Sequence, residues 1–125
     1  MNISKELLSE VLSFNENWYV YSLYLEDNIL NINAKSSANE KASDFIEINI
    51  YELAHKCKEW ATENKYTILT ENMYPNGYFA YVLSNKESIE NYGYLCEHKV
   101  IEDIPHNKTE PEAVFKACQW ILENK

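Results

Sequence analysis

The arrangement of the chain is decided by one amphipathic stretch, Asn49-Ile50-Tyr51-Glu52-Leu53-Ala54-His55-Lys56-Cys57-Lys58-Glu59-Trp60-Ala61. Apolar side chains recur along it at intervals of three and four residues, which predicts a helix over residues 50–64 with one buried face. Asn49 is suited to the N-cap position, because its side chain can accept a hydrogen bond from a free amide of the first turn. Asn64 is suited to the left-handed backbone conformation that often ends a helix.

Strands are predicted on the N-terminal side of this helix. Residues 17–35 predict a β-hairpin, since aromatic and β-branched residues are frequent there and Asp27-Asn28 tolerates the left-handed backbone of a turn. The first strand of the hairpin is apolar on both faces, so we expect it to be central in a sheet or covered on both sides. Phe45-Ile46-Glu47-Ile48 predicts a short further strand, and residues 4–14 predict an N-terminal helix.

A second set of strands is predicted on the C-terminal side. Residues 66–83 predict a hairpin around the turn signal Pro75-Asn76-Gly77, and residues 92–101 predict another strand. Thr109-Glu110-Pro111-Glu112 has the pattern of a capping box and opens a last helix over residues 110–123. The predicted order is therefore α-ββ-(β)-α-βββ-α. It indicates an α+β domain over residues 1–125, with a mostly antiparallel sheet and helices packed on it.

The two long helices resemble each other in sequence. Residues 56–65 align without gaps on residues 116–125, with matches at lysine, tryptophan, glutamate, asparagine and lysine. Either a duplicated unit of strands and helix or a shared compositional bias explains the similarity. A duplication predicts pseudo-twofold packing, with Trp60 and Trp120 in related environments.

Charge is the most informative part of the composition. The formal net charge of the 125 residues is −9, and all 11 basic residues are lysines. Arginine is the preferred side chain for bidentate phosphate and guanine contacts, and an acidic surface repels phosphate backbones and anionic lipid. A genome rich in A and T also explains the absence of arginine. We expect a protein partner with a basic surface, and neither direct nucleic-acid binding nor membrane binding.

The cysteines and the N-terminus favour a cytoplasmic protein. Cys57, Cys96 and Cys118 are an odd number, which does not suit a secreted disulfide framework. The first residues lack the basic start and apolar run of a signal peptide, and no apolar stretch approaches the roughly 20 residues needed to span a bilayer.

Few residues are arranged for chemistry. Cys96 and His98 would share one face of a strand, and with His106 they form the best candidate for a metal site or a thiol–imidazole pair. The alternative is a set of buried thiols and solvated imidazoles. Gly77 and Gly93 are the two glycines, and neither lies in a phosphate-binding pattern. We therefore expect no cofactor and no catalytic residue.

Tyrosine is frequent in the chain, with 10 residues. This residue type is enriched at protein interfaces. Most strand tyrosines are expected to pack the ring and leave the hydroxyl in water. Tyr74, Tyr78 and Tyr81, around the second hairpin, are the predicted interface cluster. The acidic residues expected to take part in binding are Glu87, Glu90, Glu102 and Asp103.

The run Thr109-Glu110-Pro111-Glu112-Ala113-Val114-Phe115-Lys116-Ala117 resembles the closing helix of small phage and prophage proteins of the α/β/α "phage ABA sandwich" kind. The preceding order of hairpin and helix is similar too. The resemblance implies an accessory product of a mobile element that binds and blocks a host protein, as anti-CRISPR inhibitors do, and it implies no catalytic residue.

The leading hypothesis is a non-catalytic acidic binding protein that inhibits a basic host protein such as a nucleic-acid-handling enzyme. Toxin-immunity proteins are similar in size and charge and form one alternative. A small metal-binding or enzymatic domain that uses the cysteine and histidines is another, and a homo-oligomer paired through a tyrosine face is a third.

Overall fold

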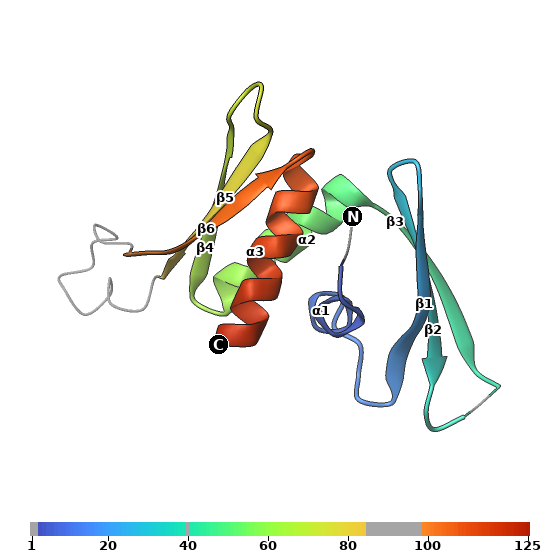
Figure 1. Ribbon diagram of the computed structural model, residues 1–125. Helices are drawn as coiled ribbons and strands as arrows, with labels where there is room; N and C mark the ends of the chain where they lie inside the picture. The colour runs from blue at the N-terminus through green and yellow to red at the C-terminus, as the bar shows by residue number, and fades with distance from the viewer. Residues whose placement is uncertain (1–2, 40, 85–98) are drawn as a thin grey trace.

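Helices form the middle layer of the molecule, and a three-stranded sheet lies on each side of them (Figure 1). The computed structural model describes residues 3–39, 41–84 and 99–125, and for residues 99–106 it describes the backbone alone. Within these residues the order of elements is the predicted one. The elements are α1 (Lys5–Val11), β1 (Trp18–Glu26), β2 (Ile29–Ser36), β3 (Ser43–Asn49), α2 (Ile50–Glu63), β4 (Tyr66–Asn72), β5 (Tyr78–Ser84), β6 (Lys99–Asn107) and α3 (Glu110–Asn124).

The strands form two antiparallel sheets rather than one. Sheet A has the order β1-β2-β3 and sheet B the order β4-β5-β6. The α+β class and the antiparallel pairing are thus confirmed, and the single sheet is corrected to two. Each sheet covers only one side of the helices, so both sides of the helical layer are buried.

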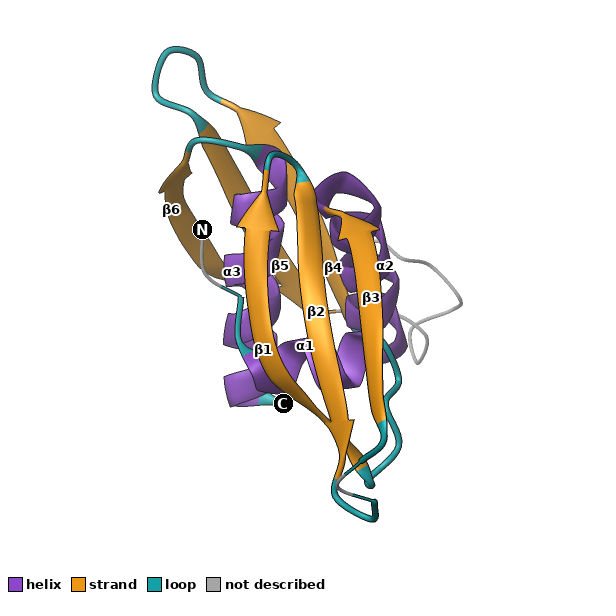
Figure 2. Cartoon of the chain, turned by 90° about the vertical axis from the view of Figure 1, so that its right-hand side faces the viewer, coloured by secondary structure: helices purple, strands orange, loops and turns teal. Residues whose placement is uncertain are grey.

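Sheet A has one apolar and one polar face because its central strand alternates. Leu30, Ile32 and Ala34 of β2 are buried against the helices, while Asn31 and Asn33 project to the other face. Figure 2 looks onto this outer face, with β2 between its two neighbours and no helix in front of it.

The expectation that the first strand is central or covered on both sides is wrong. Strand β1 is an edge strand of sheet A, and its outer face is open to solvent. Tyrosine explains the difference, because it adds to the apolar pattern of a strand although its hydroxyl tolerates water.

The helices begin at the predicted caps. Asn49 accepts a hydrogen bond from the amide of Tyr51 at 2.8 Å, and Thr109 Oγ1 accepts one from the amide of Glu112 at 3.3 Å. At the end of α2, however, the left-handed residue is Lys65 with φ 70°, whereas Asn64 has φ −94°. The Asn64 side chain instead donates to the carbonyl oxygen of Trp60 at 2.8 Å.

Strand β6 differs from the strand predicted over residues 92–101. It is described from Lys99 and continues to Asn107, while residues 92–98 lie outside the described part. The charged pair Glu102-Asp103 and Pro105 are residues typical of a strand end, so the predicted strand ends before them. An edge strand accommodates both features, because one side of it makes no ladder hydrogen bonds.

One hydrophobic core joins the three layers. Leu7 of α1, Ile32 of sheet A and Val82 of sheet B belong to the same buried cluster, and α2 and α3 pack against each other within it. Cys57 and Cys118 are fully buried where the two helices meet, and Cys118 Sγ donates to the carbonyl oxygen of Cys57 at 3.5 Å.

The chain repeats a topological unit, three antiparallel strands in consecutive order followed by a helix. Asn64 and Asn124 each donate a side-chain hydrogen bond to the tryptophan carbonyl four residues earlier, at 2.8 Å. The tryptophans differ in their surroundings: Trp60 is buried beside Lys125, whereas Trp120 is half-buried and packs edge-on against Tyr66. The repeat is a fact of topology, and the duplication stays a prediction.

Candidate functional site

The outer face of sheet A carries the most prominent group of exposed aromatic side chains in the described part of the molecule. Tyr19 is 45% exposed, Tyr24 is 51% exposed and Phe45 is 50% exposed. All three project from the face that Figure 2 shows uncovered. Large rings that stay half in water are available for burial against a partner.

The antiparallel register arranges this face in rows that cross the three strands. Tyr24 of β1 lies opposite Asn31 of β2, which lies opposite Glu47 of β3. Cross-strand neighbours of this kind lie within side-chain contact of one another. The row therefore places a ring, an amide and a carboxylate side by side.

The next row has the reverse order. Ser22 of β1 lies opposite Asn33, and Asn33 lies opposite Phe45 of β3. The aromatic rings of the two rows are thus diagonal to each other across the sheet. A third row contains Tyr19, Lys35 and Ser43.

The amide groups of the central strand are oriented by hydrogen bonds within the sheet. Asn33 Nδ2 donates to Ser22 Oγ at 3.1 Å, and Asn31 Nδ2 donates to the carbonyl oxygen of Ile29 at 3.4 Å. Each amide nitrogen keeps a second N–H, so the half-buried Asn33 side chain can donate as well as accept at this face. Asn31 is only 5% exposed and offers little surface to a partner.

The edges of sheet A are poorly suited to pairing with a strand of a partner, so its outer face is the better docking surface. A register shift between Val20 and Ser22 interrupts the edge strand β1, and Lys5 Nζ donates to the carbonyl oxygen of Tyr21 at 3.0 Å. On β3 the amide of Phe45 donates to the Asp44 carboxylate at 2.9 Å. Bulges and charged side chains are the usual means by which edges are blocked.

The structure does not bring Tyr74, Tyr78 and Tyr81 together. Tyr74 is 89% exposed at the tip of the β4–β5 hairpin. Tyr78 packs against the core, whereas Tyr81 lies in register with Leu69, and its hydroxyl donates to Glu71 Oε2 at 3.1 Å. The predicted cluster is therefore three separate environments, of which only the hairpin tip is fully exposed.

The remaining predicted residues lie where no side chain is described. Glu87, Glu90, Cys96 and His98 lie outside the described residues. Glu102, Asp103 and His106 belong to β6, where Glu102 is in register with Val82 and Asp103 with Tyr81. Within the described part of the chain, no group of three or more histidine, cysteine or acidic side chains is placed to hold a metal ion.

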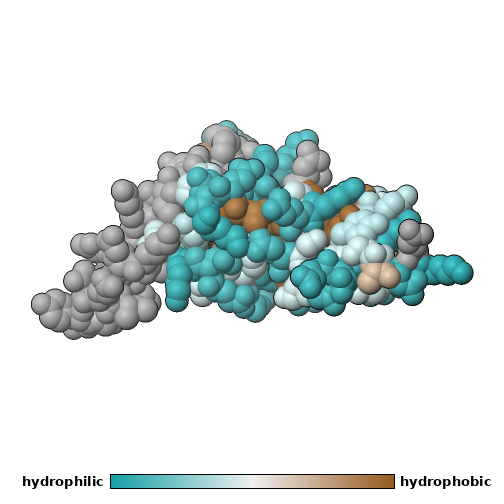
Figure 3. Space-filling model, turned by 90° about the horizontal axis from the view of Figure 1, so that it is seen from below, coloured by the Kyte–Doolittle hydropathy of each residue, from teal (hydrophilic) through white to brown (hydrophobic). Residues whose placement is uncertain are grey.

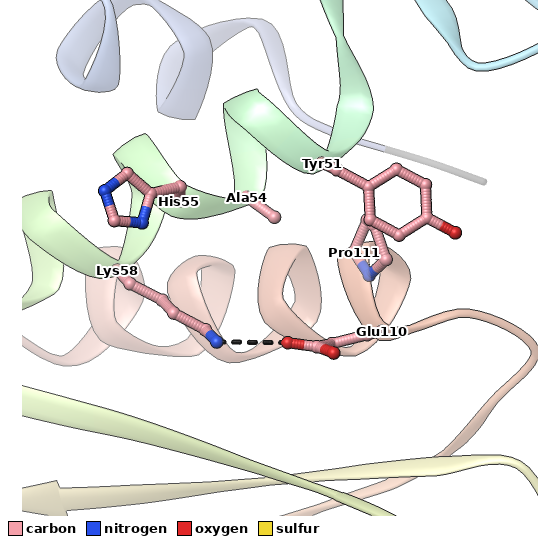
Figure 4. Close-up of a pocket in the computed structure, with 6 residues that line it drawn as sticks. All are labelled: Tyr51, Ala54, His55, Lys58, Glu110 and Pro111. Atoms are coloured by element: carbon pink, nitrogen blue, oxygen red, sulfur yellow. Dashed lines mark hydrogen bonds and ion pairs between the residues drawn. The ribbon is translucent and has the colours of Figure 1, made fainter.

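A small cavity lies between the N-terminal part of α2 and the first turn of α3 (Figure 4). It has a volume of about 220 Å³ and is lined by Tyr51, Ala54, His55, Lys58, Glu110 and Pro111. Lys58 Nζ forms an ion pair with Glu110 Oε1 at 3.1 Å, and His55 Nε2 lies 2.9 Å from Glu59 Oε1. The polar side chains of its lining are thus engaged, Lys58 with Glu110 and His55 with Glu59 outside the cavity, which leaves them less suited to bind a ligand.

Figure 3 looks onto the molecule from below the view of Figure 1, and the described residues there are mainly hydrophilic, with the hydrophobic ones in small patches. The outer face of sheet A, with its exposed rings, is therefore a stronger candidate for a contact surface than this side of the molecule.

No family model, no curated protein and no solved structure matches the chain. In the described ranges no helix is long and apolar enough to cross a membrane.

Proposed function

We propose that the protein is a non-catalytic binding module that docks the outer face of sheet A onto a partner protein with a basic surface. The observation that carries the proposal is the set of three half-exposed rings, Tyr19, Tyr24 and Phe45, on a sheet face that no element of the described residues covers. Tyrosine anchors dominate the energetics of many interfaces, because burying the ring gains apolar contact while the hydroxyl keeps a hydrogen bond.

The charge of the chain favours a basic partner. The net charge is −9, and the strands of sheet A carry three carboxylates, on Glu26, Asp44 and Glu47, against one ammonium, on Lys35. Electrostatic complementarity of this kind accelerates association and disfavours acidic partners. A nucleic-acid-handling enzyme is the partner class that fits best, since its binding groove is positive, and occupation of that groove would inhibit it.

An open sheet with exposed rings also resembles the platforms on which single-stranded nucleic acids stack. Such platforms need cations along the backbone path. Among the side chains of the three strands of sheet A, Lys35 is the only basic one, and its ammonium lies 3.6 Å from the centroid of the Tyr21 ring. The charge of the face therefore favours a protein partner over a nucleic acid.

The experiment is a capture from lysate of the native host cell with three baits, treated with nuclease and eluted with increasing salt. The baits are the wild-type protein, the Tyr24→Ala/Phe45→Ala variant and a Tyr51→Ala variant. Tyr51 is 53% exposed, like the two rings of the face, but it lies on α2 beside the cavity, so it is a matched control.

We expect one basic protein on the wild-type and Tyr51→Ala baits. The Tyr24→Ala/Phe45→Ala bait should retain at most about a tenth of it, because truncation of two anchors removes hot-spot contacts. Salt should elute the captured protein, because it screens the attraction between the acidic bait and its basic partner. The Debye length falls from about 10 Å at 0.1 M to about 3 Å at 1 M. Equal capture by all three baits would rule out the face of sheet A as the binding surface.

A further inference from the structure

The outer face of sheet A places acceptor oxygens beside its rings. Asn33 donates one N–H within the sheet and is half-buried, so its oxygen can accept from a ligand, whereas Asn31 is only 5% exposed. The Glu47 carboxylate is exposed in the same row as Asn31, and within the described residues it takes part in no ion pair. A ligand that complements Glu47 and the Asn33 oxygen therefore brings donors and positive charge.

The rings of the face are placed to receive a cation. Tyr24 and Phe45 stand in adjacent rows, each beside one of the asparagines. A cation already lies on a third ring of the same sheet, because Lys35 Nζ is 3.6 Å from the centroid of Tyr21. The electron-rich face of a ring attracts a cation in this geometry.

Building on the proposed function, we infer that the outer face of sheet A recognises arginine side chains of the partner, one stacked on Tyr24 beside Glu47 and one stacked on Phe45 beside Asn33. A guanidinium is planar, so it stacks on a ring and donates from its edge to neighbouring oxygens at the same time. An ammonium is a compact point charge that donates without stacking.

The register sets the distance between the two positions. Tyr24 and Phe45 are two strands apart, and their rows are two residues apart along β2. With strands about 4.8 Å apart and a rise of about 3.3 Å per residue, the backbone positions that carry the two rings are about 12 Å apart. An extended peptide with arginine at positions i and i+4 spans about this distance.

The probe is therefore the blocked pentapeptide Arg-Gly-Gly-Gly-Arg, titrated into the isotope-labelled full chain and followed by NMR. The controls are the same peptide with citrulline, which keeps the shape without the charge, and with lysine. We expect the arginine peptide to shift the ring signals of Tyr24 and Phe45 and the amide signals of Asn33. The lysine peptide should bind at least about threefold more weakly, and the citrulline peptide should produce no saturable shift.

Variants separate stacking from general charge attraction. Phe45→Leu keeps an apolar side chain of similar size but removes the ring, and Glu47→Gln removes the carboxylate. Each variant should lower the affinity for the arginine peptide at least about threefold, while its NMR spectrum stays that of a folded protein. Lys35→Ala frees the ring of Tyr21 and should strengthen binding more than Lys56→Ala, which makes the same change of charge on the exposed side of α2.

Equal shifts from the arginine and citrulline peptides, or arginine-induced shifts that leave the rings of the face unmoved, would overturn the inference. The proposed function fails separately. If the captured partner is lost from the Tyr24→Ala/Phe45→Ala bait but the arginine peptide is indistinguishable from citrulline, the face binds a protein by other contacts.

Discussion

Cys118 shows how the surroundings of one residue change its chemistry. Its side chain is fully buried between α2 and α3, and its thiol donates to the carbonyl oxygen of Cys57. A hydrogen bond with the Cys57 side chain and then burial raise the pKa of the Cys118 thiol above its usual range. The folded protein therefore keeps this proton at a pH where the unfolded chain loses it.

This difference predicts a dependence of stability on pH. Below the ordinary thiol pKa of about 8.5 both states hold the proton, and above it only the folded state does. The free energy of unfolding should then fall with rising pH, by up to about 1.4 kcal/mol per pH unit for this one proton. Urea unfolding between pH 8 and pH 10 should give a shallower slope for Cys118→Ala than for the wild type. Identical slopes would mean that this thiol is not protected.

Gly77 is the residue that the β4–β5 hairpin depends on most. Its φ is 96°, and a Cβ placed there would collide with the backbone carbonyl oxygen of Asn107. Gly77→Ala should lower the free energy of unfolding by about 1–3 kcal/mol, because the strained backbone and the collision add. Asn76→Ala, at the exposed neighbouring position, should change it by less than about 0.5 kcal/mol. Urea denaturation measures both, and equal effects would contradict this role for Gly77.

Helix α2 connects sheet A, which precedes it in the chain, to sheet B, which follows it. It begins directly after β3, and its N-cap Asn49 accepts from the amide of Tyr51. Asn49→Ala should cost about 1 kcal/mol of unfolding free energy, whereas Asn49→Ser should cost much less because serine also caps. The measurement is the urea midpoint at unchanged slope. A cost for Asn49→Ser as large as that for Asn49→Ala would point to a role other than capping.

The sequence was sufficient to predict the order of the elements and several of their ends, although β6 extends to Asn107 and not to the predicted residue 101. The turn at Asp27-Asn28, the cap at Asn49 and the capping box at Thr109 depend on residues within one or two turns, so local patterns were enough. The position of β1 at an edge depends on which strands pair. Pairing is decided by long-range contacts, which a strand containing Tyr19, Tyr21 and Tyr24 does not specify.

At the scale of the whole molecule, the division into two sheets was not predictable for the same reason. Two sets of three strands can form one sheet or two, and the outcome depends on both sides of α2 and α3 being buried. Once the sheets lie on opposite sides, each has an outer face turned away from the helices (Figures 1 and 2).

The candidate site follows from this layout, which is why the sequence pointed elsewhere. Tyr74, Tyr78 and Tyr81 are close in sequence but separate in space. Tyr24 and Phe45, in contrast, are brought onto one face by the register of β1, β2 and β3. The available signal was the alternation Leu30-Asn31-Ile32-Asn33-Ala34, which indicates one polar face and one buried face.

The most direct test of docking through sheet A is a hydroxyl-radical footprint of the protein with and without its captured partner. Mass spectrometry measures the reactivity of individual aromatic side chains. If the partner docks on sheet A, it protects Tyr19, Tyr24 and Phe45, while Tyr51 on α2 and Tyr74 at the hairpin tip react as in the free protein. Protection of Tyr74 or Tyr51, with the rings of sheet A still reactive, would contradict docking through sheet A.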